Sequence, residues 1–231
     1  ADTYQWERAP PPIVETYDFP EPDLMEELIK LFFTHSAYCV PLLHRPTFQR
    51  SVKEGLHYRD SGFAMTLLGV CALGARWSND PRVLLEGTTS LHSSGYKWYR
   101  QMKFFHENTL RAPSIYELQA FCVSRHSFPL HWYLTSSQIA VMYLQGSSTV
   151  EKCWYLIGFG IRAALDIGLN LKPKYQTKPT IEGELRKRVW YTLMLAEMVV
   201  SATAGRTPSI NPSECVLSSV LIYMACKLTS L

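Results

Sequence analysis

The sequence predicts an all-α domain built as an array of antiparallel helix pairs. Apolar residues recur every three or four positions through most of the chain, as they do on the buried face of a helix. The alternating pattern of a strand and the dipeptides of tight hairpin turns are scarce. With 231 residues, 47% of them hydrophobic, the chain is long and apolar enough to bury a large core.

The N-terminal part predicts a linker followed by two helices. Residues 1–16, which include Pro10-Pro11-Pro12, are expected to be extended. A first helix is expected at Pro22, because proline suits the first turn and acidic residues follow at the positive end of the helix dipole. A second helix is expected to begin at Pro46, with Gly55 as its cap.

The next two segments predict a central helix and an aromatic helix. Residues Phe63–Trp77 are apolar on most sides, and small residues such as Gly69 and Gly74 allow neighbouring elements to approach closely. This composition predicts a helix that is packed on all sides. The segment Ser90–Glu107, rich in Tyr, Trp and Phe, is expected to form the following helix.

Two capping boxes mark further helix starts. Ser114 precedes Glu117 by three residues, and Ser148 precedes Glu151 in the same way, so that each pair can satisfy free backbone N–H groups. The second box is expected to open a helix that ends at Gly168, and a last helix is expected from Ile181. Their predicted buried stripes are Trp154, Ile157, Ile161 and Leu165 in the first, and Leu185, Val189, Leu193 and Ala196 in the second.

Two sixteen-residue segments do not fit the helical pattern. Residues 123–138 interrupt an apolar helix whose halves, Leu118–Cys122 and Ile139–Gln145, would join if the segment were removed. Residues 216–231 form a tail of the same length, and both segments follow a Cys and open with Val, whose codons begin with the GT of an intron. We interpret both as translated introns; the alternative is a natural surface insertion and a short tail. Genomic DNA aligned with transcripts distinguishes the two.

Composition and charge exclude several function classes. The net charge of +3 is dispersed, with no run of five Lys or Arg, so the basic surface of a nucleic-acid reader is not predicted. The six cysteines are far apart and contain no Cys-x-x-Cys pair, so no metal site is predicted from them. The longest apolar tract, Val216–Ala225, is too short to span a bilayer, and no membrane association is predicted.

The sequence contains none of the common catalytic signatures. A Walker loop, a dinucleotide fingerprint and a Gly-x-Ser-x-Gly elbow are all missing. His35, Cys39 and His44 have a spacing that could place metal ligands together, but Pro41 interrupts the helix and no carboxylate completes the set. The basic triplet Arg186–Arg188 is interpreted as a solvated or ion-paired helix face. We therefore expect no enzymatic activity.

Three segments in a fixed order suggest a family. The run Trp154–Leu171, reading WYLIGFGIRAALDIGLNL, is followed by Glu184–Tyr191, reading ELRKRVWY, and then by Gly205-Arg206. Together with Tyr17–Phe48 and Gly69–Trp77, these segments resemble the regulatory middle domain of fungal zinc-cluster transcription factors. The resemblance covers most of residues 17–215. The family's domain continues well past the Gly-Arg motif, so the resemblance implies a domain that is truncated at its C-terminus.

The resemblance implies a function and a set of partners. Proteins of this family regulate RNA polymerase II genes in the nucleus and bind DNA through a cluster of six cysteines and two zinc ions, a module that these residues lack. It implies no cofactor for this chain, with transcription machinery, co-regulators or a second copy of the chain as partners. The family-motif residues, interpreted as structural, are Arg162, Asp166, Gly168, Arg188, Trp190, Gly205 and Arg206.

The chain departs from the family pattern at three points. Tyr191 stands where a second Trp is common, Glu197 lies in a triplet where Leu-Asp-Arg is common, and Thr207 stands where Gly-Arg is commonly followed by Pro. Two other functions stay open. The chain could be a helical module that binds a small effector, with Trp98, Trp154 and Trp190 lining an apolar pocket, or a protein-interaction module without DNA function.

Overall fold

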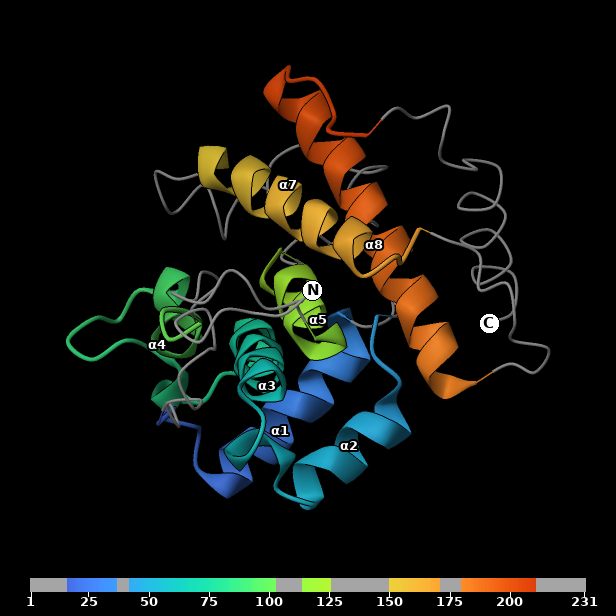
Figure 1. Ribbon diagram of the computed structural model, residues 1–231. Helices are drawn as coiled ribbons and strands as arrows, with labels where there is room; N and C mark the ends of the chain where they lie inside the picture. The colour runs from blue at the N-terminus through green and yellow to red at the C-terminus, as the bar shows by residue number, and fades with distance from the viewer. Residues whose placement is uncertain (1–15, 37–41, 103–113, 126–149, 171–179, 211–231) are drawn as a thin grey trace, which may run out of the picture.

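A computed structural model describes residues 16–36, 42–102, 114–125, 150–170 and 180–210 (Figure 1). Across these ranges the ordered elements are helices, and no strand occurs, which confirms the predicted all-α class. The arrangement as antiparallel pairs stays a prediction. The α-helices are α1 (Pro22–Leu31), α2 (Arg45–Lys53), α3 (Ser61–Gly74), α4 (Tyr96–Tyr99), α5 (Ile115–Arg125), α7 (Val150–Asp166) and α8 (Ile181–Ala204).

Short helices extend or connect these elements. A π-helical turn, η1 (Phe32–Ser36), continues α1. The 3₁₀ turns are η2 (Leu56–Tyr58), η3 (Ala75–Trp77), η4 (Pro81–Val83) and η5 (Leu91–Ser93). The predicted starts at Pro22 and near Pro46 are confirmed, and Gly55 adopts a left-handed φ of 68° directly after the second helix. Proline supplies no backbone N–H, so it is tolerated in the first turn, where no intrahelical acceptor is available.

Helix α3 lies at the centre of the N-terminal part (Figure 1). Every residue from Gly62 to Gly74 is buried, as the all-round apolar composition of this segment predicts. Asp60 begins the helix by accepting a hydrogen bond on Oδ1 from the Phe63 N–H, at 2.8 Å. Helices α1, α4 and α5 each pack against α3.

Helix α5 connects α3 to the C-terminal helices. The Thr66 hydroxyl on α3 donates to the Tyr116 carbonyl on α5, at 2.8 Å. The first predicted capping box is confirmed: the Ser114 N–H donates to Glu117 Oε2 at 2.6 Å, and the Glu117 N–H donates to Ser114 Oγ at 3.1 Å. On its other side α5 contacts both α7 and α8. The Ser148 residue of the second predicted box lies outside the described residues.

Helices α7 and α8 pack against each other (Figure 1), and α8 begins at Ile181, where the sequence predicts. Thr180 caps α8 by accepting a hydrogen bond from the Gly183 N–H, at 3.0 Å. The predicted stripe of α7 is correct for Ile157 and Ile161, but Leu165 is 39% exposed and Ala164 is buried in its place. In α8, Val189 and Leu193 are buried, whereas the flanking positions predicted from the stripe are only partly buried.

The prediction of one helix over Ser90–Glu107 is wrong in its described part. Residues 91–93 form a 3₁₀ turn and only Tyr96–Tyr99 form α4. Gly95 separates the two with a φ of 76°, and its N–H donates to the Val83 carbonyl at 3.0 Å. The chain turns here because Gly95 packs directly against the backbone of α3, a contact that local periodicity does not reveal. Residues 103–107 lie outside the described ranges.

Gly95 and Gly87 provide a matched pair for testing this contact. Both have a left-handed φ, 76° and 78°, but a Cβ at Gly95 would lie 2.4 Å from the Ala72 carbonyl oxygen, whereas one at Gly87 would meet nothing within 4 Å. We predict that Gly95→Ala lowers the free energy of unfolding by about 1–3 kcal/mol more than Gly87→Ala does. Urea denaturation measures both, and equal losses would contradict the close contact.

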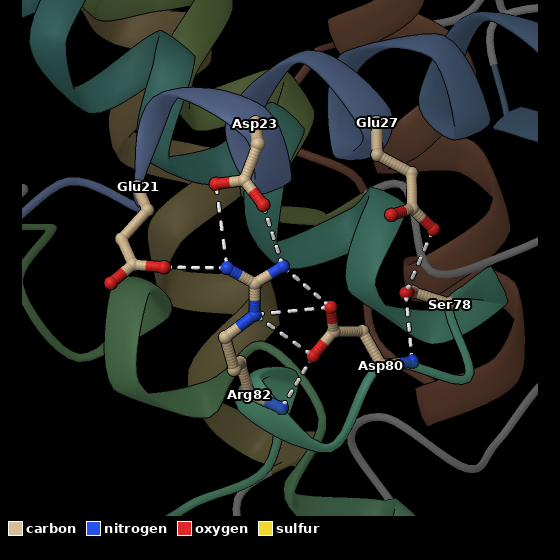
Figure 2. A network of polar contacts seen from close by, with 6 residues as sticks. All are labelled: Glu21, Asp23, Glu27, Ser78, Asp80 and Arg82. Carbon is tan, nitrogen blue, oxygen red and sulfur yellow. Dashed lines mark hydrogen bonds and ion pairs between the residues drawn. The ribbon is translucent and has the colours of Figure 1, made fainter.

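A polar network ties the start of α1 to η4 (Figure 2). The Arg82 guanidinium lies between three carboxylates: it donates to Glu21, to Asp23 at 2.8 Å, and to Asp80 at 2.8 Å. Hydrogen bonding to Arg82 holds the pKa of both Asp23 and Asp80 below the usual range. Beside it, the Ser78 hydroxyl donates to Glu27 of α1 at 3.2 Å. These contacts fix the loop between α3 and α4 against α1.

His57 is buried among aromatic rings without a polar partner. Its side chain is 5% exposed, the Phe19 ring meets it edge-on at 4.9 Å, and neither ring nitrogen has a hydrogen-bond partner in the described structure. Burial lowers the pKa of His57 from its ordinary value of 6.5, because the surrounding rings do not solvate a charge. The folded protein therefore holds this histidine in its neutral form at neutral pH.

The His57 environment predicts a pH dependence of stability. As pH falls below about 6.5, His57 becomes protonated in the unfolded chain but stays neutral in the folded chain, because its pKa is lower there. Protonation therefore favours the unfolded state, and the free energy of unfolding decreases. We predict that His57→Phe flattens this acidic slope while changing stability little at pH 8. The exposed His92→Asn variant serves as the control and should keep the slope. Chemical denaturation across pH 5–8 checks this, and an unchanged slope in His57→Phe would contradict it.

Candidate functional site at the junction of α7 and α8

Two of the segments that carry the family resemblance, Trp154–Leu171 and Gly205-Arg206, meet where the chain leaves α8. Helix α8 ends at Gly205, whose φ of 62° is left-handed, and residues 205–210 then turn back; we call them the Gly-Arg segment. The Arg206 N–H donates to the Ser201 carbonyl at 2.9 Å and closes the helix end. This closure directs the Arg206 side chain toward α7.

Arg206 packs on two aromatic residues of α7. Its guanidinium carbon lies 4.9 Å from the centroid of the Trp154 ring and 5.9 Å from that of the Tyr155 ring. A cation over an aromatic face is stabilised by about 0.5–1 kcal/mol at an exposed site and by more when it is desolvated. The contact joins the start of α7 to the residues that follow α8. It therefore brings together two motifs that lie some fifty residues apart in the sequence.

Glu197 supplies a second attachment for the Gly-Arg segment. Its side chain is 1% exposed, and Oε1 accepts a hydrogen bond from the Ser209 N–H at 2.6 Å. A Cβ at Gly158 of α7 would lie 3.5 Å from Ser209 Oγ, so the segment also passes close to α7. Charge-assisted hydrogen bonds of this kind are shorter and stronger than neutral ones. The segment is thus attached at Arg206 and at Ser209.

Three buried polar atoms at this junction have no hydrogen-bond partner in the described structure. They are Glu197 Oε2, Ser201 Oγ and Trp154 Nε1. Glu197 and Ser201 lie one turn apart on α8 and continue the buried stripe of Val189 and Leu193. Burying such groups without partners costs free energy, so the junction is a part of the described core whose hydrogen bonding is incomplete. The predicted stripe of α8 omits both residues, although Glu197 follows Leu193 by four positions and Ser201 follows Glu197 by four.

The remaining motif residues have structural contacts or lie on the surface. Arg188 donates to Glu184 at 3.1 Å and Arg186 donates to Glu182 at 3.2 Å, so two of the three residues of the basic triplet are ion-paired. Trp190 is partly buried against the core. The other three are at α7: Arg162 and Asp166 are exposed, and Gly168, with a φ of 69°, ends the helix as predicted.

The three tryptophans proposed for an effector pocket come from different elements. Trp98 belongs to α4 and is 2% exposed, with the Lys97 ammonium 4.7 Å from its ring centroid. Trp154 belongs to α7 and Trp190 to α8. Figure 1 shows α4 and α8 on opposite sides of α3 and α5. Trp154 is the one of the three that lies at the Gly-Arg segment, and a pocket lined by all three stays a prediction.

Residues that sequence spacing offered as metal ligands have other neighbours. The His35 ring stacks on Trp77 with centroids 4.6 Å apart, and His44 Nδ1 pairs with the Thr47 hydroxyl at 2.8 Å. Burial raises the pKa of the Cys71 thiol, which favours its protonated form. Within the described ranges no group of three metal-ligating side chains occurs. No helix described here is long and apolar enough to cross a membrane.

Comparison of the sequence with known proteins shows which family the chain belongs to. Residues 29–220 match the family described as the fungal specific transcription factor domain. The matched range includes residues 123–138 and reaches five residues past Cys215. No solved structure matches the chain.

Curated relatives are transcription factors of fungi. The chain is 25% identical over 201 residues to Activator of stress genes 1 of Saccharomyces cerevisiae, covering 81% of this chain and 19% of that protein. It is 23% identical to Transcription factor FBD3 of Gibberella moniliformis, covering 84% and 24%. It is 24% identical to the C6 finger domain transcription factor adaR of Aspergillus niger, covering 84% and 23%. The chain thus spans about a fifth to a quarter of the length of these relatives.

The Glu197 attachment predicts a local loss of protection on mutation. In Glu197→Ala the Ser209 N–H loses its acceptor, so we expect faster hydrogen exchange across residues 206–210 and a lower thermal midpoint. Glu197→Gln keeps an acceptor oxygen and should recover part of the protection. Glu182→Ala is the matched control, because it removes an exposed ion pair that contributes at most about 1 kcal/mol. Unchanged exchange at Ser209 in Glu197→Ala would show that this bond does not hold the segment.

Proposed function

This chain belongs to the fungal specific transcription factor domain family, and from that premise we propose that its parent protein is a zinc-cluster regulator of RNA polymerase II genes that acts in the nucleus. The observation that carries the proposal is the family match over residues 29–220, supported by relatives named as transcription factors. The chain itself is the regulatory domain. Its function is the control of transcription rather than catalysis.

DNA recognition in this proposal is assigned to a zinc cluster outside these 231 residues. A cluster of six cysteines needs ligands that are close in sequence, whereas the six cysteines here are separated by 10 residues or more. Buried Cys71, whose thiol favours its protonated form, is a poor zinc ligand. The residues present do not fit the zinc cluster, and the regulatory domain is expected to act without a cofactor of its own.

Protein partners are favoured over DNA for the regulatory domain itself. Two of the three cations of the α8 basic triplet, Arg186 and Arg188, are paired with Glu182 and Glu184, which reduces the charge that the triplet offers to a phosphate backbone. We infer that co-regulators, the transcription machinery or a second copy of this chain bind the domain. Through such contacts it would alter the activity of the DNA-bound protein.

A comparison of the 231-residue chain with the longer gene product tests whether DNA recognition lies outside the regulatory domain. We predict that the 231-residue chain binds any DNA duplex only weakly, with a Kd of about 10⁻⁴–10⁻⁶ M at physiological salt and a steep salt dependence. The gene product read with its upstream sequence should contain Cys-x2-Cys-x6-Cys spacing and bind one duplex specifically, with loss of binding on zinc chelation. Anisotropy titrations measure both affinities.

Two outcomes would contradict the proposal. Tight, sequence-dependent binding by the 231-residue chain would place DNA recognition inside the regulatory domain. An upstream reading frame without the cysteine spacing would remove the zinc-cluster assignment. A reporter assay with the chain tethered to an unrelated DNA-binding domain adds a direct readout: we expect a change in reporter expression relative to the untethered chain.

A further inference from the structure

The Gly-Arg segment contains the sole Ser/Thr-Pro dipeptide of the chain. Each of the other 13 prolines follows a residue that is neither Ser nor Thr, whereas Pro208 follows Thr207. Thr207 and Pro208 are both exposed, and residues 206–208 have no helical conformation. Proline after Thr207 biases that residue toward an extended backbone. Proline-directed serine/threonine kinases select this combination: an exposed hydroxyl in an extended segment, with proline directly after it.

The position of Thr207 would give a phosphate a structural effect. The residue lies between the two attachments of the Gly-Arg segment, directly after Arg206 and two residues before Ser209. Arg206 contacts aromatic rings, and no carboxylate is paired with it in the described structure. Ser209 is bonded to the buried carboxylate of Glu197. A phosphate on Thr207 would therefore follow the Arg206 cation, which has no carboxylate partner among the described residues. It would also precede Ser209, which is bonded to the Glu197 carboxylate.

We propose that Thr207 is a phosphorylation site whose modification releases the Gly-Arg segment from α7 and α8. In the reaction, Thr207 Oγ1 attacks the γ-phosphorus of ATP and forms a new O–P bond. The bond from that phosphorus to the bridging oxygen breaks, ADP leaves, and the hydroxyl proton passes to the base of the kinase. The products are phosphothreonine and ADP, and no further reactant is needed.

Two electrostatic effects act in the same direction after phosphorylation. The phosphate carries a charge of about −1.5 to −2, and its hydrogen bonds to a guanidinium are stronger than a contact between a cation and an aromatic ring. Arg206 is therefore drawn from Trp154 toward the phosphate. The same negative charge is repelled by Glu197, which weakens the bond from the Ser209 N–H. Both attachments of the segment are weakened by a single modification.

The site is tested by treating the folded chain with ATP and a purified proline-directed kinase. We expect one phosphate per chain, located at Thr207 by fragmentation mass spectrometry. Thr207→Val and Pro208→Ala should both abolish incorporation, and the second retains the hydroxyl. Ser209→Ala should be modified like the unsubstituted chain, since that position lacks a following proline. Incorporation elsewhere, or retained incorporation in Pro208→Ala, would overturn the assignment.

The structural consequence needs its own readout. In the phosphorylated chain, hydrogen exchange across residues 206–210 should accelerate, and iodide should quench more of the tryptophan fluorescence. The additional quenching should disappear in Trp154→Phe, because Trp154 is the ring that Arg206 covers. Unchanged exchange in a fully phosphorylated chain would overturn the release of the segment. None of these measurements involves DNA, so their outcome is separate from that of the proposed function.

Discussion

Helix α3 has no face that meets water, because every residue from Gly62 to Gly74 is buried. A helix of this kind cannot be stable alone, since its apolar surface is removed from water only when other elements cover each side. At two points α3 and a covering segment come so close that a glycine is required. A Cβ at Gly74 of α3 would lie 2.1 Å from the Leu28 carbonyl oxygen, and a Cβ at Gly95 would lie 2.4 Å from the Ala72 carbonyl oxygen of α3. These backbone contacts place α1 and α4 around α3.

The C-terminal helices depend on the same centre through α5. Thr66 of α3 is bonded to the backbone of α5, and α5 contacts both α7 and α8. The packing is most apolar at α3, whereas toward the end of α8 the buried positions include Glu197 and Ser201, whose Oε2 and Oγ atoms have no hydrogen-bond partner among the described residues. A well-packed centre with a less satisfied, polar periphery suits a regulatory domain, because elements of low local stability are the ones that respond to a partner or a modification.

The elements with local signals could be predicted from the sequence. Proline at Pro22, the capping box at Ser114 and the apolar run from Phe63 each depend on residues that are adjacent or one turn apart, and each predicted element is confirmed. The failures share a different cause. The helix predicted through Gly95 is broken because that glycine packs against α3, and Leu165 is exposed because α7 meets its neighbours with Ala164 instead. Both outcomes depend on contacts between distant segments.

The candidate site was only partly predictable for the same reason. The Gly205-Arg206 motif and Trp154 could be recognised, but their mutual contact requires the end of α8 to reach the start of α7. Glu197 lies on the buried face of α8, but this charged residue was not included in the predicted apolar stripe. Its four-residue spacing from Leu193 was the available signal, but the predicted stripe ended at Ala196 instead.

Native-state hydrogen exchange, followed by mass spectrometry at low denaturant, tests the central role of α3 most directly. If the domain is organised around this helix, amides of residues 64–74 exchange only through global unfolding, with a free energy equal to that of the whole domain. Residues 206–210 should exchange earlier, through local opening. Exchange in α3 at a lower free energy than in α7 or α8 would contradict the account, because it would show that the C-terminal helices stay folded without the helix on which they are proposed to depend.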